Sequence, residues 1–522
     1  MAASEGSEVA AAGELDFVVV GCGAGGSIAA ATLAQAGARV LVLEEGVHHT
    51  RHDFNMQEAW AYPALYQDRG NRATDDLSIM ILQGRSVGGG TTINWTSSFR
   101  APARTLALWA SRHGVRGLDQ EALAPHFAAV EERLSVGPGN PDDVNANNRK
   151  LLEGARALGW GPELIPRSVK GCARLGYCGM GCPLDAKQSA LVTFVPDAVA
   201  AGADVLTGCR VTRIEADGRR ATAVHADTLD EETTPRRAGQ GHGHERASPP
   251  ARRALTFHPR RGVVLAGGAI NTPALLLRSK VGNRNGRVGR RTFLHPAVPI
   301  VGFFREPIEA YYGAPQSVAC QHFADRGERM GYFLETAPVH PMLASIAFPG
   351  FGDPHRRIAE RLPHVQATIA LAIDGHHSDE GGTVRADDDG RIRLAYPLSA
   401  LHREAFVDAL ENLARLLFAA GAAEVMTLHT DPLVLRGVGD IPRIKAAPFG
   451  PNLHTLFSAH QMGGCAMGSD PAASVVNSVG RHHQLDNLWI ADGSVFPTSL
   501  GINPQMTIYA VARLIATAVA RS

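Results

Sequence analysis

The sequence predicts an α/β protein with two parts, one built on a parallel β-sheet and one built on a mainly antiparallel β-sheet. Three observations support this prediction. A strand–turn–helix–strand unit opens the chain at residues 16–45, an alternating apolar pattern runs through residues 298–396, and glycine-rich segments return in residues 443–522. With 522 residues and 45% hydrophobic content, the chain is long enough to build two domains.

The first unit begins with residues 16–20, a short apolar run that is typical of a buried strand. Gly21, Gly23 and Gly26 follow at the spacing Gly-x-Gly-x-x-Gly, and residues 27–36 are predicted to form an alanine-rich helix. The first glycine allows the turn, the second lets a pyrophosphate approach the backbone, and the third lets helix and strand pack closely.

The second strand of this unit, residues 39–43, ends at an acidic pair. Glu44 is placed to accept hydrogen bonds from a ribose hydroxyl, whereas Glu45 is expected to point to the opposite face, because adjacent strand residues alternate. Together with the glycine motif, this acid predicts a Rossmann-like site for FAD or NAD.

The remaining elements follow in order. Residues 118–158 look helical, residues 171–183 form a loop rich in cysteine and glycine, and residues 203–265 look strand-like. Within the last stretch, residues 230–253 are charged and poor in apolar side chains, so we expect a flexible surface insertion there. Further helices are predicted at residues 271–278, 402–420 and 504–519.

Composition narrows the class of protein. Lys plus Arg and Asp plus Glu both number 51, so nothing indicates a nucleic-acid partner. The N-terminus lacks the basic and apolar regions of a signal peptide, and no apolar run is long enough for a transmembrane helix. Seven cysteines are an odd number and do not suggest a disulfide scaffold. These observations predict a cytoplasmic protein.

The segment Gly84–Trp95, GRSVGGGTTINW, resembles the signature of the glucose–methanol–choline (GMC) oxidoreductases. The resemblance extends to residues 266–269, 460–468, 488–497 and the pair Asn503-Pro504, in the family's order; Gly464 departs from it where the family usually has threonine. The loop at residues 177–189 is similar to that of the long-chain alcohol oxidase branch.

The resemblance implies a GMC fold, in which a Rossmann-like FAD-binding domain is interleaved with a substrate or cap domain on a mainly antiparallel sheet. The FAD-binding domain would comprise residues 14–50, 80–105, 190–300 and 455–522, and the cap domain residues 51–79, 106–189 and 301–454. Besides the glycines and Glu44 of the first unit, the residues expected to bind FAD are Arg85, Val87, Gly88, Gly89, Thr91, Asn94, Trp95, Val211, Ala266, Asp492, Gly493, Pro504 and Gln505.

The resemblance also implies that His460 and Asn503 lie side by side over the flavin. His460 would act as base for the substrate hydroxyl or, as an imidazolium, stabilise the alkoxide, and Asn503 would hold the substrate oxygen. Asn503 before Pro504 also has the pattern of a helix N-cap, a role that does not conflict with the first. We expect His295 to be structural.

Cys172, Cys178 and Cys182 leave an alternative open, because some relatives hold an iron–sulfur cluster in a similar loop. The spacing does not match the usual cluster motif, so we expect ordinary thiols and no metal. His242 and His244 could bind a metal ion, but we expect them to belong to a solvated loop instead.

The predicted function is oxidation of a primary, fairly apolar alcohol to the aldehyde by hydride transfer to flavin N5, with noncovalent FAD and dioxygen as acceptor. A dehydrogenase that uses a quinone or cytochrome acceptor, and a lyase resembling hydroxynitrile lyase, remain alternatives. No histidine stands between Gly84 and Arg100, where some relatives attach the flavin covalently.

Overall fold

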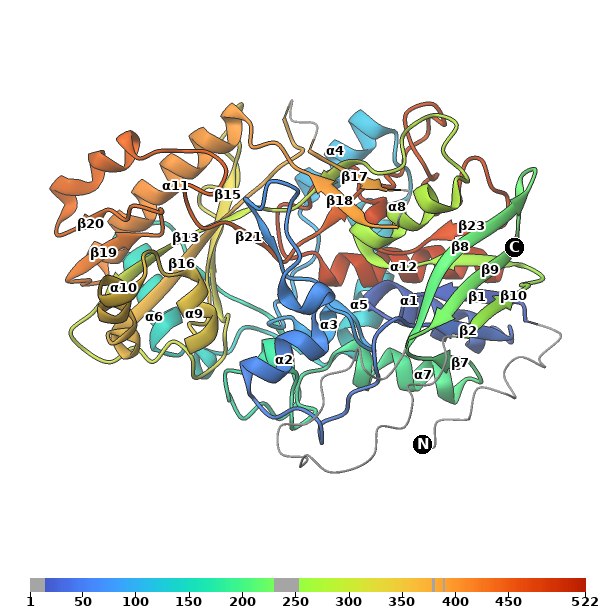
Figure 1. The fold of residues 1–522 in the computed structure, drawn as a ribbon, viewed down its shortest axis with the longest axis horizontal. Helices are drawn as coiled ribbons and strands as arrows, with labels where there is room; N and C mark the ends of the chain where they lie inside the picture. The colour runs from blue at the N-terminus through green and yellow to red at the C-terminus, as the bar shows by residue number, and fades with distance from the viewer. Residues whose placement is uncertain (1–14, 230–252, 378–380, 388–389) are drawn as a thin grey trace.

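The computed structural model describes residues 15–229, 253–377, 381–387 and 390–522 (Figure 1). A parallel sheet and its helices occupy one end of the long axis, and a large antiparallel sheet occupies the other. The predicted insertion at 230–253, with His242 and His244, falls outside the described residues except for Arg253.

The parallel sheet has the order β23-β11-β1-β2-β7. Its strands are β1 (Phe17–Val20), β2 (Val40–Leu43), β7 (Asp204–Leu206), β11 (Gly262–Leu265) and β23 (Leu488–Ile490). The four residues of β1 and of β2 are all buried, as expected for inner strands of a parallel sheet that is covered on both faces. The covering helices are α1 (Ala24–Gln35), α5 (Gln120–Arg133), α7 (Phe194–Ala200) and α12 (Gln505–Ala520), with α12 packed on α1.

Two small antiparallel sheets flank the parallel sheet. One has the order β10-β9-β8 and the other β18-β17-β12-β22, with α8 (Gly268–Ser279) packed between them. Their strands are β8 (Cys209–Asp217), β9 (Arg220–Thr228), β10 (Ala254–Phe257), β12 (Arg290–Phe293), β17 (Gly382–Ala386), β18 (Ile392–Ala395) and β22 (Met462–Gly463).

The second part is a nine-stranded sheet whose core strands are antiparallel. Its strands are β20 (Val434–Leu435), β19 (Glu424–Thr427), β13 (Ala297–Phe303), β16 (Val365–Ala372), β15 (Tyr332–Thr336), β14 (Val318–Cys320) and β5 (Glu163–Leu164). In addition, β21 (Phe457–Ser458) pairs with β13, and β3 (Met80–Ile81) pairs with β21. The helices α6 (Ala146–Ala157) and α11 (Ala400–Ala419) pack against this sheet.

Shorter elements join the two parts. They are α2 (Glu58–Leu65), α3 (Gly90–Ile93), α4 (Ala103–His113), α9 (Pro341–Ala347), α10 (Gly352–Ala359), β4 (Val136–Gly137) and β6 (Arg167–Ser168). The short 3-10 turns include η4 (Cys178–Met180), η8 (Val438–Ala446) and η9 (Gly493–Val495).

The predicted fold class is confirmed, whereas several predicted bounds are wrong. Residues 118–158 do not form one helical stretch, because Ser135 adopts a positive φ of 50° after α5 and the chain passes through β4 before α6 begins. Helix α1 begins at Ala24 rather than near residue 27. The helix predicted at residue 402 begins at Ala400, because Ser399 and His402 form a capping box.

The proposed domain boundary at residue 300 falls inside β13. Within the described residues, no helix combines the length and the apolar character needed to cross a bilayer.

Candidate active site

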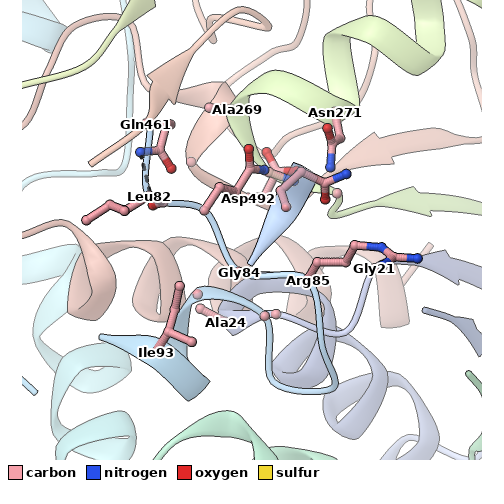
Figure 2. A pocket seen from close by; sticks show the side chains of 18 of the residues that line it. Gly21, Ala24, Leu82, Gly84, Arg85, Ile93, Ala269, Asn271, Gln461 and Asp492 are labelled. Carbon is pink, nitrogen blue, oxygen red and sulfur yellow. Dashed lines mark hydrogen bonds between the residues drawn. The ribbon is translucent and has the colours of Figure 1, made fainter. Parts of the chain in front are cut away.

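A cavity of about 630 Å³ lies where the parallel sheet meets the large antiparallel sheet (Figure 2). Residues from both parts line it, and Figure 2 shows Gly21, Gly84 and Asp492 on its wall. Most of the residues predicted to bind the cofactor line this cavity: Gly21, Gly23, Glu44, Arg85, Gly89, Thr91, Asn94, Trp95, Val211, Ala266, Asp492, Gly493, Pro504 and Gln505.

The glycine loop between β1 and α1 forms one end of the cavity. Gly21 has φ of +98°, and a Cβ there would lie 2.5 Å from the carbonyl oxygen of Ala266. A Cβ at Gly26 would collide with the carbonyl oxygen of Gly21, so Gly26 allows close packing but does not line the cavity. A Cβ at Gly23 would meet only Gly89 Cα, at 3.8 Å, and would project into the space that a pyrophosphate needs.

Glu44 receives hydrogen bonds from two backbone amides. Its Oε2 accepts from the N–H of Cys22 and its Oε1 from the N–H of Gly46, both at 2.8 Å. Burial raises the pKa of Glu44 to about 7. Each oxygen keeps a second lone pair, so the carboxylate can still accept a hydrogen bond from a ribose hydroxyl.

Glu45 also lines the cavity, although the alternation of strand residues predicted that it points away. It forms ion pairs with Arg85 and Arg210, each at 2.9 Å. Burial raises the pKa of this carboxyl, but the guanidinium groups of Arg210 and Arg85 outweigh that effect and lower it. β2 ends at Leu43, so the strict alternation no longer holds at Glu45.

The signature segment folds as a tight turn followed by α3. The N–H of Gly88 donates to the carbonyl of Cys22 at 3.0 Å, which joins this segment to the glycine loop. Val87 and Gly88 do not line the cavity, but hold the turn in place. Asn94 donates from Nδ2 to Oε1 of Gln505 at 2.6 Å, so the segment is also attached to the start of α12.

Asp492 joins three segments at the edge of the cavity. Its carboxylate accepts hydrogen bonds from the N–H of Gly268 (2.8 Å), the hydroxyl of Thr272 (2.6 Å) and the N–H of Ser494 (2.8 Å). Burial raises the pKa of Asp492, whereas these hydrogen bonds oppose the shift.

His460 and Asn503 lie together on the cavity wall, 3.5 Å apart between Nε2 and Nδ2. Asn503 is not a helix N-cap: α12 begins at Gln505, Pro504 occupies the cap position, and no side chain caps the helix. The Nδ2 of Asn503 instead donates to Oε2 of Glu335 at 3.3 Å, while its Oδ1 is buried and has no hydrogen-bond partner among the described residues. Burial lowers the pKa of His460 to about 4, so the ring is neutral near pH 7.

His295 contacts His460 directly, a role that the sequence did not reveal. The two Nδ1 atoms lie 3.3 Å apart, and Nε2 of His295 accepts from the N–H of Gly501 at 3.0 Å. A neutral imidazole that accepts at Nε2 carries its proton on Nδ1, so His295 donates to Nδ1 of His460. His460 therefore carries its own proton on Nε2. Because Nδ2 of Asn503, 3.5 Å away, is also a donor, the two groups do not bond to each other and both can donate to a shared oxygen.

Glu335, on β15, is the second residue that sequence reasoning missed. Its side chain is fully buried, Oε2 accepts from Gln316 and Asn503, and Oε1 has no partner in the part of the chain that the structure describes. Burial raises the pKa of Glu335 to about 8. The available signal was an acid inside the apolar strand Tyr332–Thr336, which is unusual unless the acid has a function.

Comparison with known proteins decides the family. Two family models, both described as GMC oxidoreductase, match residues 62–297 and 378–512. The chain belongs to the GMC oxidoreductase family. Its relatives include the uncharacterised GMC-type oxidoreductase Rv0492c of Mycobacterium tuberculosis, which is 33% identical over 96% of this chain and 75% of that protein.

A second relative of this GMC oxidoreductase is the long-chain-alcohol oxidase FAO4A of Arabidopsis thaliana, 31% identical over 96% of this chain and 67% of that protein. Among solved structures, pyridoxine 4-oxidase from Mesorbium loti has the same fold, with a TM-score of 0.68 and 19% identity over 97% of this chain and 99% of that one. Family membership indicates an oxidoreductase with FAD as cofactor, and the bare backbone at Gly23 and the carboxylate of Glu44 fit that dinucleotide.

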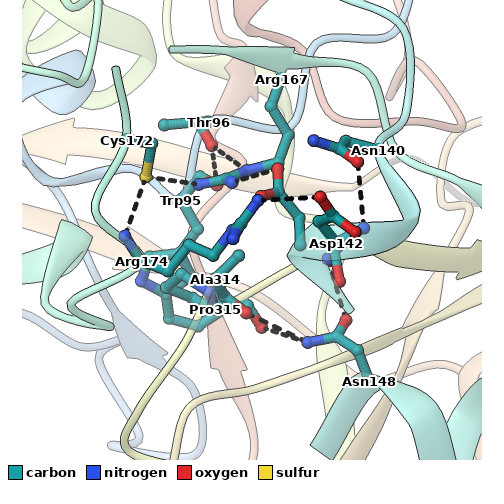
Figure 3. Close-up of polar contacts among 12 residues, drawn as sticks. Trp95, Thr96, Asn140, Asp142, Asn148, Arg167, Cys172, Arg174, Ala314 and Pro315 are labelled. Carbon is teal, nitrogen blue, oxygen red and sulfur yellow. Dashed lines mark hydrogen bonds and ion pairs between the residues drawn. The ribbon is translucent and has the colours of Figure 1, made fainter. Parts of the chain in front are cut away.

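In this GMC oxidoreductase, Lys187 in the loop at residues 177–189 and the nearby Arg167 hold the signature segment in place. Lys187 is buried, and its Nζ donates to the carbonyls of Thr92, Asn94 and Cys178. On the other side of the segment, Arg167 bonds to the hydroxyl of Thr96 at 3.0 Å and lies near Cys172 (Figure 3). These two side chains thus fix the backbone of residues 92–96, part of which lines the cavity.

All seven cysteines are free thiols. In the part of the chain that the structure describes, no three His, Cys, Asp or Glu side chains gather in a group that suits a metal ion.

Proposed function

We propose that this GMC oxidoreductase oxidises a primary, apolar alcohol to the aldehyde at His460, Asn503 and Glu335, with noncovalently bound FAD and with dioxygen as the final acceptor. When bound, FAD accepts the hydride that leaves the carbinol carbon. The observation that carries the proposal is the convergence of these three polar side chains on one wall of the cofactor-sized cavity.

Their hydrogen bonds assign the proton positions. The chain of donors from Gly501 through His295 leaves His460 with a proton on Nε2, so His460 donates to the carbinol oxygen and stabilises negative charge there. Because this nitrogen is already protonated, it is not free to accept the hydroxyl proton. His295 acts as a positioning residue, which fixes the tautomer of His460.

Glu335 is the group that accepts the hydroxyl proton. It is next to Asn503, it lines the cavity, and its Oε1 is an acceptor without a partner. In its ionised form the carboxylate takes the proton from the O–H bond as the carbon–oxygen bond gains double-bond character and the carbinol hydrogen leaves with its electron pair. Through its amide, Asn503 holds Glu335 and the substrate oxygen in position relative to each other.

A second cavity supports an apolar substrate. It measures about 380 Å³, and Leu82, Trp95 and Phe457 line both this cavity and the first one. Its other walls are mostly apolar side chains, such as Val301, Ala337 and others from β13, β16 and α9. Burial of each methylene group contributes about 0.8 kcal/mol, so a hydrocarbon tail that passes this shared wall would be bound substantially.

Noncovalent binding of FAD is supported by the signature segment, which contains no histidine from residue 84 to residue 100. Denaturation in acid followed by centrifugation tests this point, because noncovalent flavin stays in the supernatant whereas covalent flavin sediments with the protein.

The proposed reaction is tested by measuring oxygen uptake, hydrogen peroxide and aldehyde with primary alcohols of increasing chain length. Equal amounts of aldehyde and peroxide, with a preference for longer chains, are expected. Aldehyde that forms only when a quinone or cytochrome is added would replace dioxygen as acceptor. Release of a carbonyl compound from a cyanohydrin without any redox change would indicate a lyase instead.

A further inference from the structure

The backbone of His295 adopts a conformation that needs support. Its φ is +44°, in the left-handed region that residues with a side chain rarely occupy, and the following Pro296 restricts it further. His295 is fully buried and lies two residues before β13 begins. A strained backbone of this kind persists only where neighbouring groups hold it, and such positions gather at functional sites.

Asp374 supplies that support. Continuing the antiparallel register of β13 and β16, in which Ala297 pairs with Leu371, places Asp374 opposite Leu294, just beyond the paired strands (Figure 1). Its Oδ2 accepts from the N–H of Leu294 at 2.8 Å, and its Oδ1 accepts from the N–H of His295 at 3.2 Å. The carboxylate therefore takes the place of a strand partner for these two amides.

Asp374 is itself fixed by neighbouring hydroxyl groups. The hydroxyl of Tyr396 donates to Oδ2 of Asp374, and the hydroxyl of Ser499 donates to the carbonyl of Asp374 at 2.6 Å. Ser499 lies two residues before Gly501, whose N–H is bonded to Nε2 of His295. Asp374 thus holds the backbone of His295 and also bonds to the segment that supplies the donor to its ring.

The residues that Asp374 holds are linked to His460 in two ways. Ser458 donates from Oγ to the carbonyl of Leu294 at 2.5 Å and accepts from the N–H of His460 at 3.3 Å. The ring of His295 contacts the ring of His460 through the two Nδ1 atoms. Both the backbone and the tautomer of His460 therefore depend on the segment that Asp374 fixes, as expected where supporting residues set the geometry of an active site.

We propose that Asp374 is a positioning residue of the active site, which holds the backbone of His295 so that His460 carries its proton on Nε2 and donates a hydrogen bond to the substrate oxygen. Asp374 does not line the cavity, so it acts through His295 and not on the substrate. The effect on catalysis rests on the proposed function, whereas the tautomers of the two histidines are a property of the protein without substrate.

The test variant is Asp374→Asn in the holoenzyme. An amide of the same size has only one oxygen, so its NH2 group must face the N–H of either His295 or Leu294. The matched control is Asp408→Asn in α11. The carboxylate of Asp408 also accepts from a tyrosine, Tyr332 at 2.7 Å, but it bonds to neither histidine of the pair.

Nitrogen-15 NMR of protein labelled at histidine distinguishes a protonated ring nitrogen from an unprotonated one, and His295→Gln and His460→Gln assign the signals. At pH 7 the wild type and the control should each show one tautomer, with protons on Nδ1 of His295 and Nε2 of His460. Asp374→Asn should show a mixture of tautomers, and wild-type tautomers in this variant overturn the proposal. If Asp374→Asn does not fold, Ser499→Ala decides in the same way, because it removes only the hydroxyl that holds the carbonyl of Asp374.

Kinetics separate a positioning role from a merely structural one. Because His460 acts on the oxygen that gains charge, kcat of Asp374→Asn with a primary alcohol should decrease by about 10- to 100-fold, while KM changes by less than about twofold. An unchanged kcat, with an active wild type, overturns the proposal. If the wild type oxidises no alcohol but the tautomers change as expected, the proposed function fails and the role of Asp374 in fixing His460 stands.

Discussion

The assignment of Glu335 as proton acceptor makes a specific prediction about pH. Because burial raises the pKa of Glu335 to about 8, about a tenth of the carboxyl is ionised at pH 7 and about nine tenths at pH 9. Only the ionised form accepts the hydroxyl proton, so kcat/KM should increase about tenfold from pH 7 to pH 9. Glu335→Gln removes the titrating group and should give a flat profile.

The size of the loss follows from the same reasoning. Proton transfer to a positioned side chain contributes about 10²–10⁴-fold, so at pH 9 the Glu335→Gln variant should have kcat/KM lower than the wild type by about that factor. The assay is steady-state oxygen uptake between pH 6 and pH 9.5 with a primary alcohol. The matched control is Glu328→Gln, the same change at an exposed acid in the loop between β14 and β15, which is not among the groups that shift the pKa of Glu335 and should retain the wild-type profile.

Two results together would refute the role of Glu335 as proton acceptor: a wild-type kcat/KM that does not change from pH 6 to pH 9, and nearly full activity of Glu335→Gln. That result would transfer the role of base to His460, whose pKa of about 4 places its titration below this range. In that case the hydrogen bond between His295 and His460 would have to reverse its direction, which the N–H of Gly501 opposes.

Three further predictions concern binding and stability. Gly23→Val places a branched side chain in the pyrophosphate space, so the purified protein should contain far less flavin per chain by absorbance, and a variant that keeps full flavin would contradict the assigned role. Ala337→Phe fills part of the second cavity, so kcat/KM should decrease for long alcohols by about fourfold for each excluded methylene, while short alcohols are unaffected; an equal loss for all lengths would argue against a tail site. Lys187→Met leaves three carbonyls without the donor that Lys187 supplies, so a loss of about 3 kcal/mol in the free energy of unfolding and a lower Tm are expected. An unchanged Tm would show that Lys187 does not stabilise the signature segment.

The local sequence was sufficient to predict the residues on the cofactor side of the cavity. The glycine motif and the signature segment act through backbone conformation within a few residues. Gly21 marks a position where a Cβ does not fit, and Gly23 marks a position where the backbone borders the cavity without a side chain. The same locality explains the prediction for Glu44, which ends β2 beside that loop.

The network of Glu335, Asn503, His295 and His460, on the substrate side of the cavity, could not be predicted from the local sequence. Glu335 meets Asn503 across 168 positions of sequence, and His295 meets His460 across 165. These contacts depend on how the antiparallel sheet docks on the parallel one, and no local pattern encodes that packing. The N-cap interpretation of Asn503 failed for the same reason, because a tertiary partner outcompetes the local one.

The most direct measurement of the central claim is anaerobic mixing of the holoenzyme with a long-chain primary alcohol, followed at the flavin absorption band. Rapid bleaching is expected, with a slower rate when the carbinol hydrogens are replaced by deuterium, and with return of the band and formation of peroxide when air is admitted. A band that no primary alcohol bleaches, in a protein with full flavin content, would contradict the assignment of His460, Asn503 and Glu335 to alcohol oxidation.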